Sequence, residues 1–296
     1  QASAFWVPQI YSKKVQIALR KAAVAEAICN TDYMGEIKNF GDTVNIVKEP
    51  QISVSDYTRG LATSSTALTD VELVLTVDQA KYFQFALDDI EKRFSHINFQ
   101  SVASDNAAYK LRDALDSNVF AYLGLDASSI GATRQGSTST PDSIGFTSPQ
   151  IDPLNEMSQA AFFLDRQNCP EEGRWFVGAP EWYESLANTA SKLLSVDYNA
   201  GKGSLRNGLV ASGLVRGFQM YKSNNLLTTD NSGSTGTATD PVNTWGQMSA
   251  VSCATQLKIV ESLRSTTTFA DIVRGLLVFG RKVLRNDILG RTIYVI

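Results

Sequence analysis

The pattern of apolar and polar positions predicts a long two-stranded hairpin between Gly41 and Gln79. Polar and apolar residues alternate over 42–47 and again over 71–77, which is typical of half-buried strands. The stretch between them, Glu49 to Asp70, is rich in Ser, Thr, Gly and Asp and is too long for an ordinary hairpin turn. Folded back on itself, this arm would reach at most roughly 60 Å. Because isolated two-stranded arms are marginal in water, we expect the arm to lie on another surface. A disordered surface loop is the alternative for its central segment.

A long helix is predicted next, from Ile97 to Leu123, with a length of about 40 Å. Arg112 and Asp116 have pairing spacing and, with Asp105, fall on the side opposite its apolar stripe. A coiled coil is the alternative, but no heptad is sustained. Gly124 is a plausible helix end. The expected stripe consists of Phe99, Ala103, Ala107, Leu111, Ala114, Leu115 and Tyr122.

The N-terminal segment contains an Ala-rich pattern that predicts a helix from Ser12 to Ile28. Positive charge is concentrated there on Lys13, Lys14, Arg20 and Lys21. These residues either face nucleic acid or form an ordinary solvated helix face.

The second half of the chain alternates strand and helix signals. Asp152 is expected to cap a helix that begins at Pro153 and ends at Arg166. A buried strand over 174–178 and a helix over 180–194 should follow, which together indicate an α/β-like subdomain. The polar stretch from Leu227 to Gly246 is expected to be an exposed, mobile loop.

Composition narrows the class of protein. The chain has 296 residues, which is room for one large domain or two modest ones, and its 43% hydrophobic content can form a core. A net charge of −3 argues against general nucleic-acid binding over the whole surface. Three cysteines, Cys29, Cys169 and Cys253, are expected to be reduced, mostly buried thiols. No signal peptide or transmembrane-length apolar run is visible. The chain begins at Gln1 without Met, so we expect that preceding residues were cleaved off or left out.

A search for catalytic and binding motifs yields no candidate site. His96 is the only histidine, so a His-based triad or zinc site is a poor interpretation and a structural role is expected. Gly201-Lys202-Gly203 lacks the spacing and the Ser or Thr of a phosphate-binding loop. The carboxylates Asp88, Asp89 and Glu91 lack EF-hand spacing and are expected at a helix start. We therefore predict no catalytic, cofactor-binding or metal site, and a protein that is not an enzyme.

An ordered set of segments along nearly the whole chain carries a family resemblance: Phe5-Trp6, Tyr33-Met34-Gly35-Glu36-Ile37, Gly41-Asp42-Thr43-Val44, Tyr82-Phe83-Gln84-Phe85 before Asp88-Asp89, Arg174-Trp175-Phe176-Val177, Gly217 to Asn225, and Val273 to Gly280. This order resembles the major capsid proteins of tailed bacteriophages, which have the Hong Kong 97-type coat fold. No single segment is diagnostic, and the specificity lies in the order.

The resemblance implies an α+β fold with an N-terminal arm, an extended loop, a peripheral domain with a long spine helix, an axial domain, and C-terminal strands that return to the peripheral and axial domains. The corresponding ranges are 1–39, 40–79, 80–149, 150–250 and 251–296.

The function that the resemblance implies is a structural subunit that self-assembles into the icosahedral head shell around phage double-stranded DNA. The expected partners are copies of the chain in pentamers and hexamers, with packaged DNA bound non-specifically on the inner face. Cement or decoration, portal and scaffolding proteins are further candidates, and no membrane is involved. The expected location is the virion capsid, assembled in the host cytoplasm. Some relatives crosslink a loop Lys to a neighbour's Asn, and Lys48 lies in the matching arm. Neither the Asn nor the catalytic acid can be identified, so that activity is not carried over.

Two other classes remain open. An encapsulin-type compartment shell resembles the same fold, and a soluble α+β enzyme would be favoured only if the long arm were an active-site lid.

Overall fold

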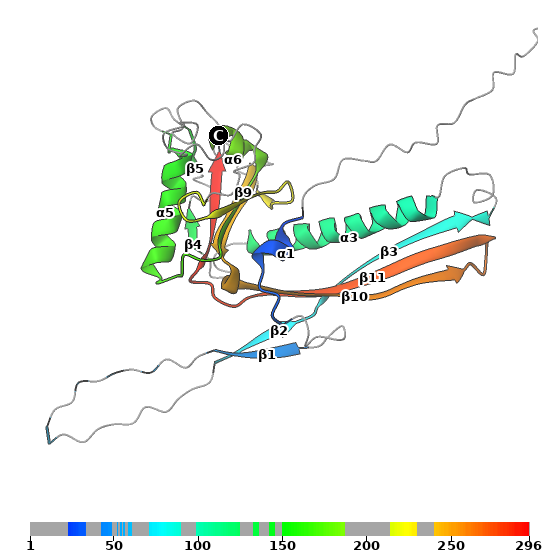
Figure 1. Cartoon of the computed structure of the whole chain (residues 1–296), viewed down its shortest axis with the longest axis horizontal. Helices are drawn as coiled ribbons and strands as arrows, with labels where there is room; N and C mark the ends of the chain where they lie inside the picture. Colours follow the sequence, from blue (N-terminus) through cyan, green and yellow to red (C-terminus); the bar gives the residue numbers. More distant parts are fainter. Residues whose placement is uncertain are drawn as a thin grey trace, which may run out of the picture.

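The computed structural model consists of an elongated layer joined at one end to a compact unit with a mixed β-sheet (Figure 1). The structure describes residues 23–33, 43–48, 52, 54, 56, 59–60, 71–89, 99–124, 133–135, 142–145, 150–186, 214–229 and 240–295.

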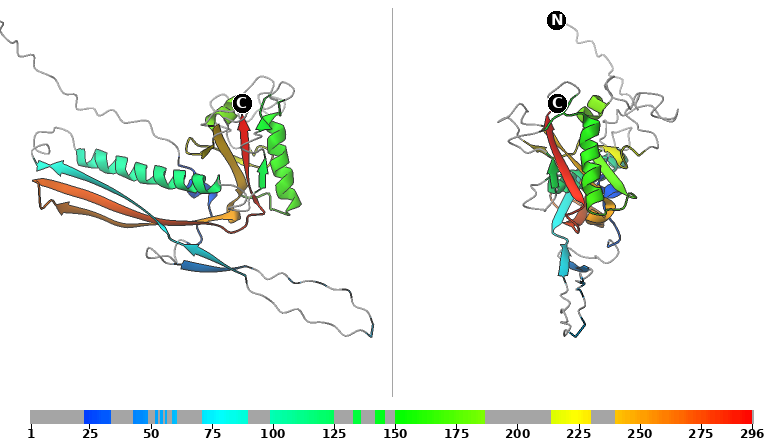
Figure 2. Two further views of the ribbon diagram at one scale, coloured as in Figure 1. Left: turned by 180° about the vertical axis from the view of Figure 1, so that it is seen from behind. Right: turned by 90° about the vertical axis from the view of Figure 1, so that its left-hand side faces the viewer.

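The elongated layer is a three-stranded antiparallel sheet in the order β10-β11-β3, with a helix along one face (Figures 1 and 2). Pairing of β10 with β11 runs from Val251 opposite Val283 to Arg264 opposite Asp271, with one irregularity after Leu257. The strands are β3 (Gln79–Asp88), β10 (Val251–Arg264) and β11 (Ala270–Val283).

The helix on this sheet is α3 (Phe99–Leu123), and it confirms the predicted long helix and its end before Gly124. Leu111 and Leu115 are buried and Arg112 is exposed, as the predicted stripe requires. Ala103, Ala107, Ala114 and Tyr122 are half-buried. Among the side chains described in α3, the buried apolar ones are Leu111, Leu115, Val119, Phe120 and Leu123.

The compact unit contains a mixed sheet in the order β4-β12-β9-β6-β7, with β5 pairing β12 and β8 pairing β9. β9 lies antiparallel between β12 and β6, whereas β6–β7 and β12–β4 are parallel pairs. The 3-10 helix η4 (Met248–Ala250) leads from β9 into β10 and so connects the two sheets. The strands are β4 (Thr133–Gln135), β5 (Asp142–Ser143), β6 (Arg174–Gly178), β7 (Gln219–Lys222), β8 (Thr228–Thr229), β9 (Asp240–Gln247) and β12 (Leu289–Val295).

Two helices pack on this sheet, α5 (Pro153–Arg166) and α6 (Pro180–Leu186). The α5 boundaries and the Asp152 cap are as predicted, since the Asp152 carboxylate accepts a 2.8 Å hydrogen bond from Leu154 N. Of the helix predicted over 180–194, the part after Leu186 lies outside the described residues. The aromatic core includes Trp182, which contacts Tyr294 edge-on at a centroid distance of 5.0 Å.

The prediction of an exposed loop from Leu227 to Gly246 is wrong where strands occur, at β8 (Thr228–Thr229) and from Asp240 onward in β9, while residues 230–239 lie outside the described part. Trp245 is fully buried opposite Gly290 of β12, and a Cβ on that glycine would lie 2.2 Å from the indole ring. The polar composition suggested a loop, but a strand paired on both sides satisfies its own backbone groups. Gly290 leaves space for the ring, a relation between positions that composition does not reveal.

The predicted helix from Ser12 to Ile28 is described only as α1 (Ala25–Ile28), and the residues before Ala23 lie outside the described part. Ala23 and Val24 are not helical, so a continuous helix through them is a wrong prediction. The reason is that the Asp116 carboxylate of α3 accepts hydrogen bonds from the backbone amides of Val24 and Ala25.

Candidate assembly surfaces

The predicted hairpin is present as β1 (Thr43–Lys48) and β2 (Val71–Thr76), which pair antiparallel from Thr43 opposite Thr76 to Lys48 opposite Val71. We call these strands, with the segment between them, the arm. The strands β1 and β2 lie on the side of the elongated sheet opposite α3 (Figures 1 and 2). Exposed apolar side chains lie on the arm: Val47, Ile52, Val54 and Val74, of which Val54 is 97% exposed. Single exposed apolar side chains are common on protein surfaces, so these four are candidates for contact with a partner and not a demonstrated binding patch.

The base of the arm is firmly attached to its own sheet. Leu75 and Val77 are buried in a small separate core with Ala254 of β10 and Val278 of β11. Gly280 of β11 lets the arm backbone approach closely, because a Cβ there would lie 2.4 Å from the Thr76 carbonyl oxygen. The arm is therefore anchored at its base, whereas apolar side chains beyond the base remain exposed.

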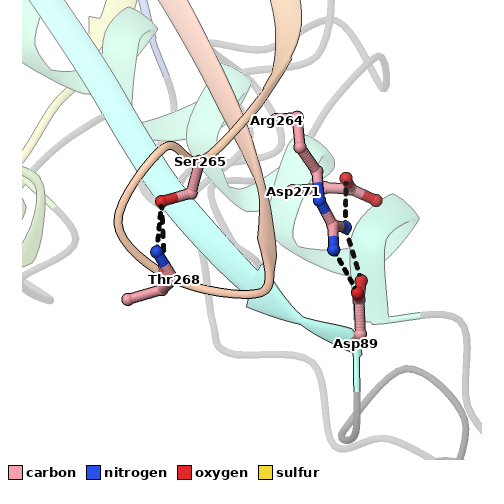
Figure 3. Close-up of polar contacts among 5 residues, drawn as sticks. All are labelled: Asp89, Arg264, Ser265, Thr268 and Asp271. Atoms are coloured by element: carbon pink, nitrogen blue, oxygen red, sulfur yellow. Dashed lines mark hydrogen bonds and ion pairs between the residues drawn. The ribbon is translucent and has the colours of Figure 1, made fainter.

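The far end of the elongated sheet carries a second exposed surface, at the turn between β10 and β11 (Figure 3). Arg264 Nη1 donates to Asp89 Oδ1 at 2.7 Å and to Asp271 Oδ1 at 3.1 Å, and its Nη2 forms a further bond to Asp89. All three side chains are partly exposed, so the ion pairs contribute little to stability. They connect Asp89, which follows β3, with the facing ends of β10 and β11.

Within this turn, Ser265 organises the backbone. Its Oγ accepts hydrogen bonds from Thr268 N at 3.1 Å and Thr268 Oγ1 at 2.9 Å, and its amide donates to Ala270 O at 2.9 Å. The adjacent Phe269 is 81% exposed. The sheet thus ends in an ordered turn that presents an aromatic ring to solvent.

The junction of α1, α3 and the compact unit centres on Asp116. This residue was predicted to lie on the solvent side of α3, which is wrong: it is 1% exposed. Its Oδ1 accepts hydrogen bonds from Val24 N at 2.8 Å and Ala25 N at 2.7 Å. Because these amides are bound by a carboxylate on another element, α1 begins at Ala25 and no helix continues through Val24.

The other oxygen of Asp116 binds the loop after β7. Asn225 Nδ2 donates to Asp116 Oδ2 at 3.0 Å and to Asp113 Oδ1 at 2.8 Å, and Ser223 Oγ lies 3.4 Å from Asp116 Oδ2. One carboxylate thereby connects three segments that are far apart in the sequence: the start of α1, the helix α3 and the loop after β7.

Two carboxyl groups of the compact unit share an environment that favours a bound proton. Burial, the charge of Asp142 and a hydrogen bond to it raise the pKa of Glu156 from 4.5 to about 7. Burial raises the pKa of Asp142, while its hydrogen bond to Glu156 opposes the rise. Glu156 belongs to α5 and Asp142 to β5, so the pair joins the helix to the edge of the sheet.

A buried arginine in the same unit connects two of its elements through hydrogen bonds. Arg174 donates to Asp165 Oδ1 at 2.7 Å, to Pro170 O at 2.9 Å and to Cys169 O at 2.6 Å. These bonds fix the connection between α5 and β6, which explains how a 3% exposed guanidinium is accommodated.

The residues weighed for chemistry from sequence are placed only in part. His96, Gly201-Lys202-Gly203 and the four basic residues of the N-terminal segment lie outside the described residues. Lys48 ends β1. Asp88 ends β3, and Asp89, which follows it directly, is helical, as the predicted helix start requires; Glu91 lies outside the described residues. In the described part of the chain, no group of three or more potential metal ligands occurs. No helix there has the length and apolarity needed to cross a membrane.

No family model matches the chain, and neither does any curated protein. Solved structures do match. A structure from Mycobacterium phage Che8 is similar with a TM-score of 0.76 and 25% identity, covering 98% of each chain. The capsid structure of cyanophage P-SCSP1u has a TM-score of 0.73 at 19% identity, covering 98% of this chain and 93% of that one. The capsid of Ralstonia phage GP4 has a TM-score of 0.64 at 14% identity and covers 100% of this chain.

The chain has the phage coat fold. Because the likeness covers nearly the whole chain, it confirms the predicted α+β Hong Kong 97-type coat fold and the resemblance to phage capsid structures. The sequence did not reveal Asp116 or Arg264 as important residues. The run Ser265-Thr266-Thr267-Thr268 between two apolar strands was the only local signal for the turn at the end of the sheet.

Proposed function

We propose that this chain is the major capsid protein of a tailed phage, a structural subunit that self-assembles into an icosahedral head shell around double-stranded DNA. The observation that carries the proposal is the full-length likeness to capsid subunits, which includes the protruding arm. A protein that worked alone would gain nothing from apolar side chains displayed on such an arm.

The distribution of burial supports self-association. Leu75 and Val77 are buried at the arm base, whereas Ile52 and Val54 farther along are 75% and 97% exposed. At the opposite end of the layer, Phe269 is 81% exposed on an ordered turn. Exposed apolar groups at separate extremities are suited to contacts with several neighbours, and many weak contacts repeated by symmetry sum to a stable shell.

We further propose the division into an N-terminal arm, extended loop, peripheral domain, axial domain and C-terminal strands. In this arrangement β10 and β11 return to the peripheral sheet and β12 to the sheet of the axial domain, where β4 and β5, from the range 80–149, pair with it. The proposed role needs no catalytic centre and no cofactor. The proposed boundaries are 1–39, 40–79, 80–149, 150–250 and 251–296.

Packaged DNA, portal, scaffolding and cement proteins are proposed partners, with assembly in the host cytoplasm. The basic residues Lys13, Lys14, Arg20 and Lys21 are candidates for the DNA-facing surface. Their neutralisation should then lower the heat stability of DNA-filled heads more than that of empty shells. An equal effect on both would assign them to a solvated face.

Electron microscopy of the purified full chain tests the function. Closed shells are expected, and DNA-filled heads with a tail portal would separate a phage capsid from an encapsulin-type shell with protein cargo. Discrete small oligomers that never form shells would overturn the proposal and favour the enzyme alternative.

The arm has its own test. Deleting Gln51 to Thr69 should leave a folded subunit by circular dichroism that fails to close shells in size-exclusion chromatography. A finer version replaces Ile52 and Val54 by Ser, with Asp56→Ser on the same segment as the matched control, since Asp56 is exposed but not apolar. Loss of shells in the apolar variant alone is expected. Normal shells from the deletion, or global unfolding of it, would contradict the role of the arm in assembly.

A further inference from the structure

Two of the three cysteines meet in the core, although 224 positions separate them in the sequence. Cys29 follows α1 and Cys253 lies in β10, and their Sγ atoms are 2.7 Å apart. The side chains are 1% and 5% exposed, and both cysteines are free thiols in the structure. The odd number and wide spacing of the cysteines in the sequence predicted reduced, mostly buried thiols and no disulfide framework.

Paired backbone runs beside the two cysteines. Asn30 forms a parallel bridge with Ser252, through bonds from Asn30 N to Val251 O at 2.8 Å and from Cys253 N to Asn30 O at 3.2 Å. Because side chains alternate along extended backbone, the residue before Asn30 and the residue after Ser252 point to the same side. The paired backbone therefore turns both side chains to one side, and the 2.7 Å contact between the sulfurs spans the diagonal between two positions that are two residues out of register.

We propose that Cys29 and Cys253 form a disulfide when the protein meets an oxidising environment. The bond would covalently tie the N-terminal segment to the elongated sheet. The bond needs the sulfurs to approach to about 2.05 Å, a small movement from their present contact. It would join the residue that follows α1 to β10, an edge strand of the elongated sheet.

The reaction balances as two successive thiol–disulfide exchanges with a small disulfide such as oxidised glutathione. The Cys253 sulfur attacks that disulfide, forms a mixed disulfide and releases one glutathione thiol. The Cys29 sulfur then attacks the Cys253 sulfur and releases the second. Two S–H bonds are lost, one S–S bond forms, the oxidant is reduced to two thiols, and these carry the two protons.

The surroundings of the two sulfurs slow this exchange in the folded protein. The hydrogen bond to Cys253 and burial raise the pKa of Cys29, which disfavours the reactive thiolate. Both sulfurs are also covered, so exchange requires α1 to open locally from β10. Thiols are expected to persist in a reducing cytoplasm and to oxidise after release, a sequence of events that rests on the proposed function as a phage shell.

The test uses the purified full chain, as free subunits and as shells, in glutathione buffers from fully reduced to fully oxidised. Equilibrium is approached both from the folded protein and by refolding in the same buffer, so slow access does not decide the result. Free thiols are blocked with N-ethylmaleimide, and the protein is digested without reductant and analysed by mass spectrometry. The expected product links the peptides of Cys29 and Cys253, with loss of two hydrogen atoms, and Cys169 remains blocked.

Variants complete the design. Cys169→Ser should retain the link, whereas Cys29→Ser should show no intrachain link, with Cys253 either free for N-ethylmaleimide or held as the mixed disulfide with glutathione. Oxidation should raise the unfolding temperature by roughly 5–10 °C in wild type and Cys169→Ser, but not in Cys29→Ser. The proposal would be overturned if Cys29 and Cys253 both carried N-ethylmaleimide after incubation in the fully oxidised buffer, whether the experiment started from folded or from refolding protein. A link that involves Cys169 or a second chain would also overturn it. Because the link is read on free subunits, its failure is distinguishable from a failure of shell assembly.

Discussion

Replacing Asp116 tests whether one buried carboxylate joins the N-terminal segment, the spine helix and the compact unit. Asp116→Ala removes two bonds from backbone amides at 2.8 and 2.7 Å and one from Asn225 Nδ2 at 3.0 Å. It also leaves the amides of Val24 and Ala25, which belong to buried residues, without this acceptor. Hydrogen bonds to a charged group are worth about 1.5–3 kcal/mol each, and they are not additive.

From these values we expect Asp116→Ala to lower the free energy of unfolding by about 3–5 kcal/mol. Asp116→Asn should cost less, about 1–2 kcal/mol, because its amide oxygen can still accept from the two backbone amides. Its new NH₂ group would face the NH₂ group of Asn225, which accounts for the remaining loss. Asp113→Ala is the matched control on the same turn, since Asp113 makes one bond to Asn225 at 2.8 Å. It should cost about 0.5–1.5 kcal/mol.

Urea unfolding of the full-length subunit, followed by tryptophan fluorescence, measures these differences, because Trp175, Trp182 and Trp245 are all buried in the compact unit. Hydrogen exchange measured by mass spectrometry adds a local readout at residues 23–30, which should lose protection in Asp116→Ala. A loss no larger than that of Asp113→Ala, or unchanged protection at residues 23–30, would refute the reasoning.

Three further predictions concern pH, the arm base and the spine. The raised pKa of Glu156 means that the folded state holds a proton which the unfolded chain releases above about 4.5, so stability should fall between pH 4.5 and about 7. The loss in the free energy of unfolding is at most roughly 3 kcal/mol. Glu156→Gln should remove most of this pH dependence when the free energy of unfolding is measured with urea from pH 4 to 8. An unchanged pH dependence in the variant would count against the proton shared with Asp142. Gly280→Val should displace the arm base, because its Cβ would meet the Thr76 carbonyl oxygen at 2.4 Å, and increased proteolysis near β2 would show it; wild-type resistance would contradict it. Leu111→Asp buries an unpaired charge and should cost several kcal/mol, so soluble variant shells at wild-type yield would disprove its place in the spine.

Local rules were sufficient for much of the secondary structure. Alternation of apolar and polar residues predicted β1 and β2, because side chains of a strand point to opposite faces whatever the strand packs against. The Asp152 cap and Pro153 predicted the start of α5, because a helix start needs an acceptor for its first amides within a few residues. The spine helix was predicted by a stripe at helical spacing.

Tertiary structure decided what each polar residue does. Asp116 has the spacing of a solvated ion pair with Arg112, yet it is buried because amides some ninety positions earlier lie against it. Trp245 lies in a segment of loop-like composition, but Gly290 on the neighbouring strand makes room for its ring. Nothing near Cys29 in the sequence indicates Cys253. Periodicity and capping act over a few residues and can be read along the chain, whereas a buried polar partner is selected by the whole fold, from positions that only chain packing brings together.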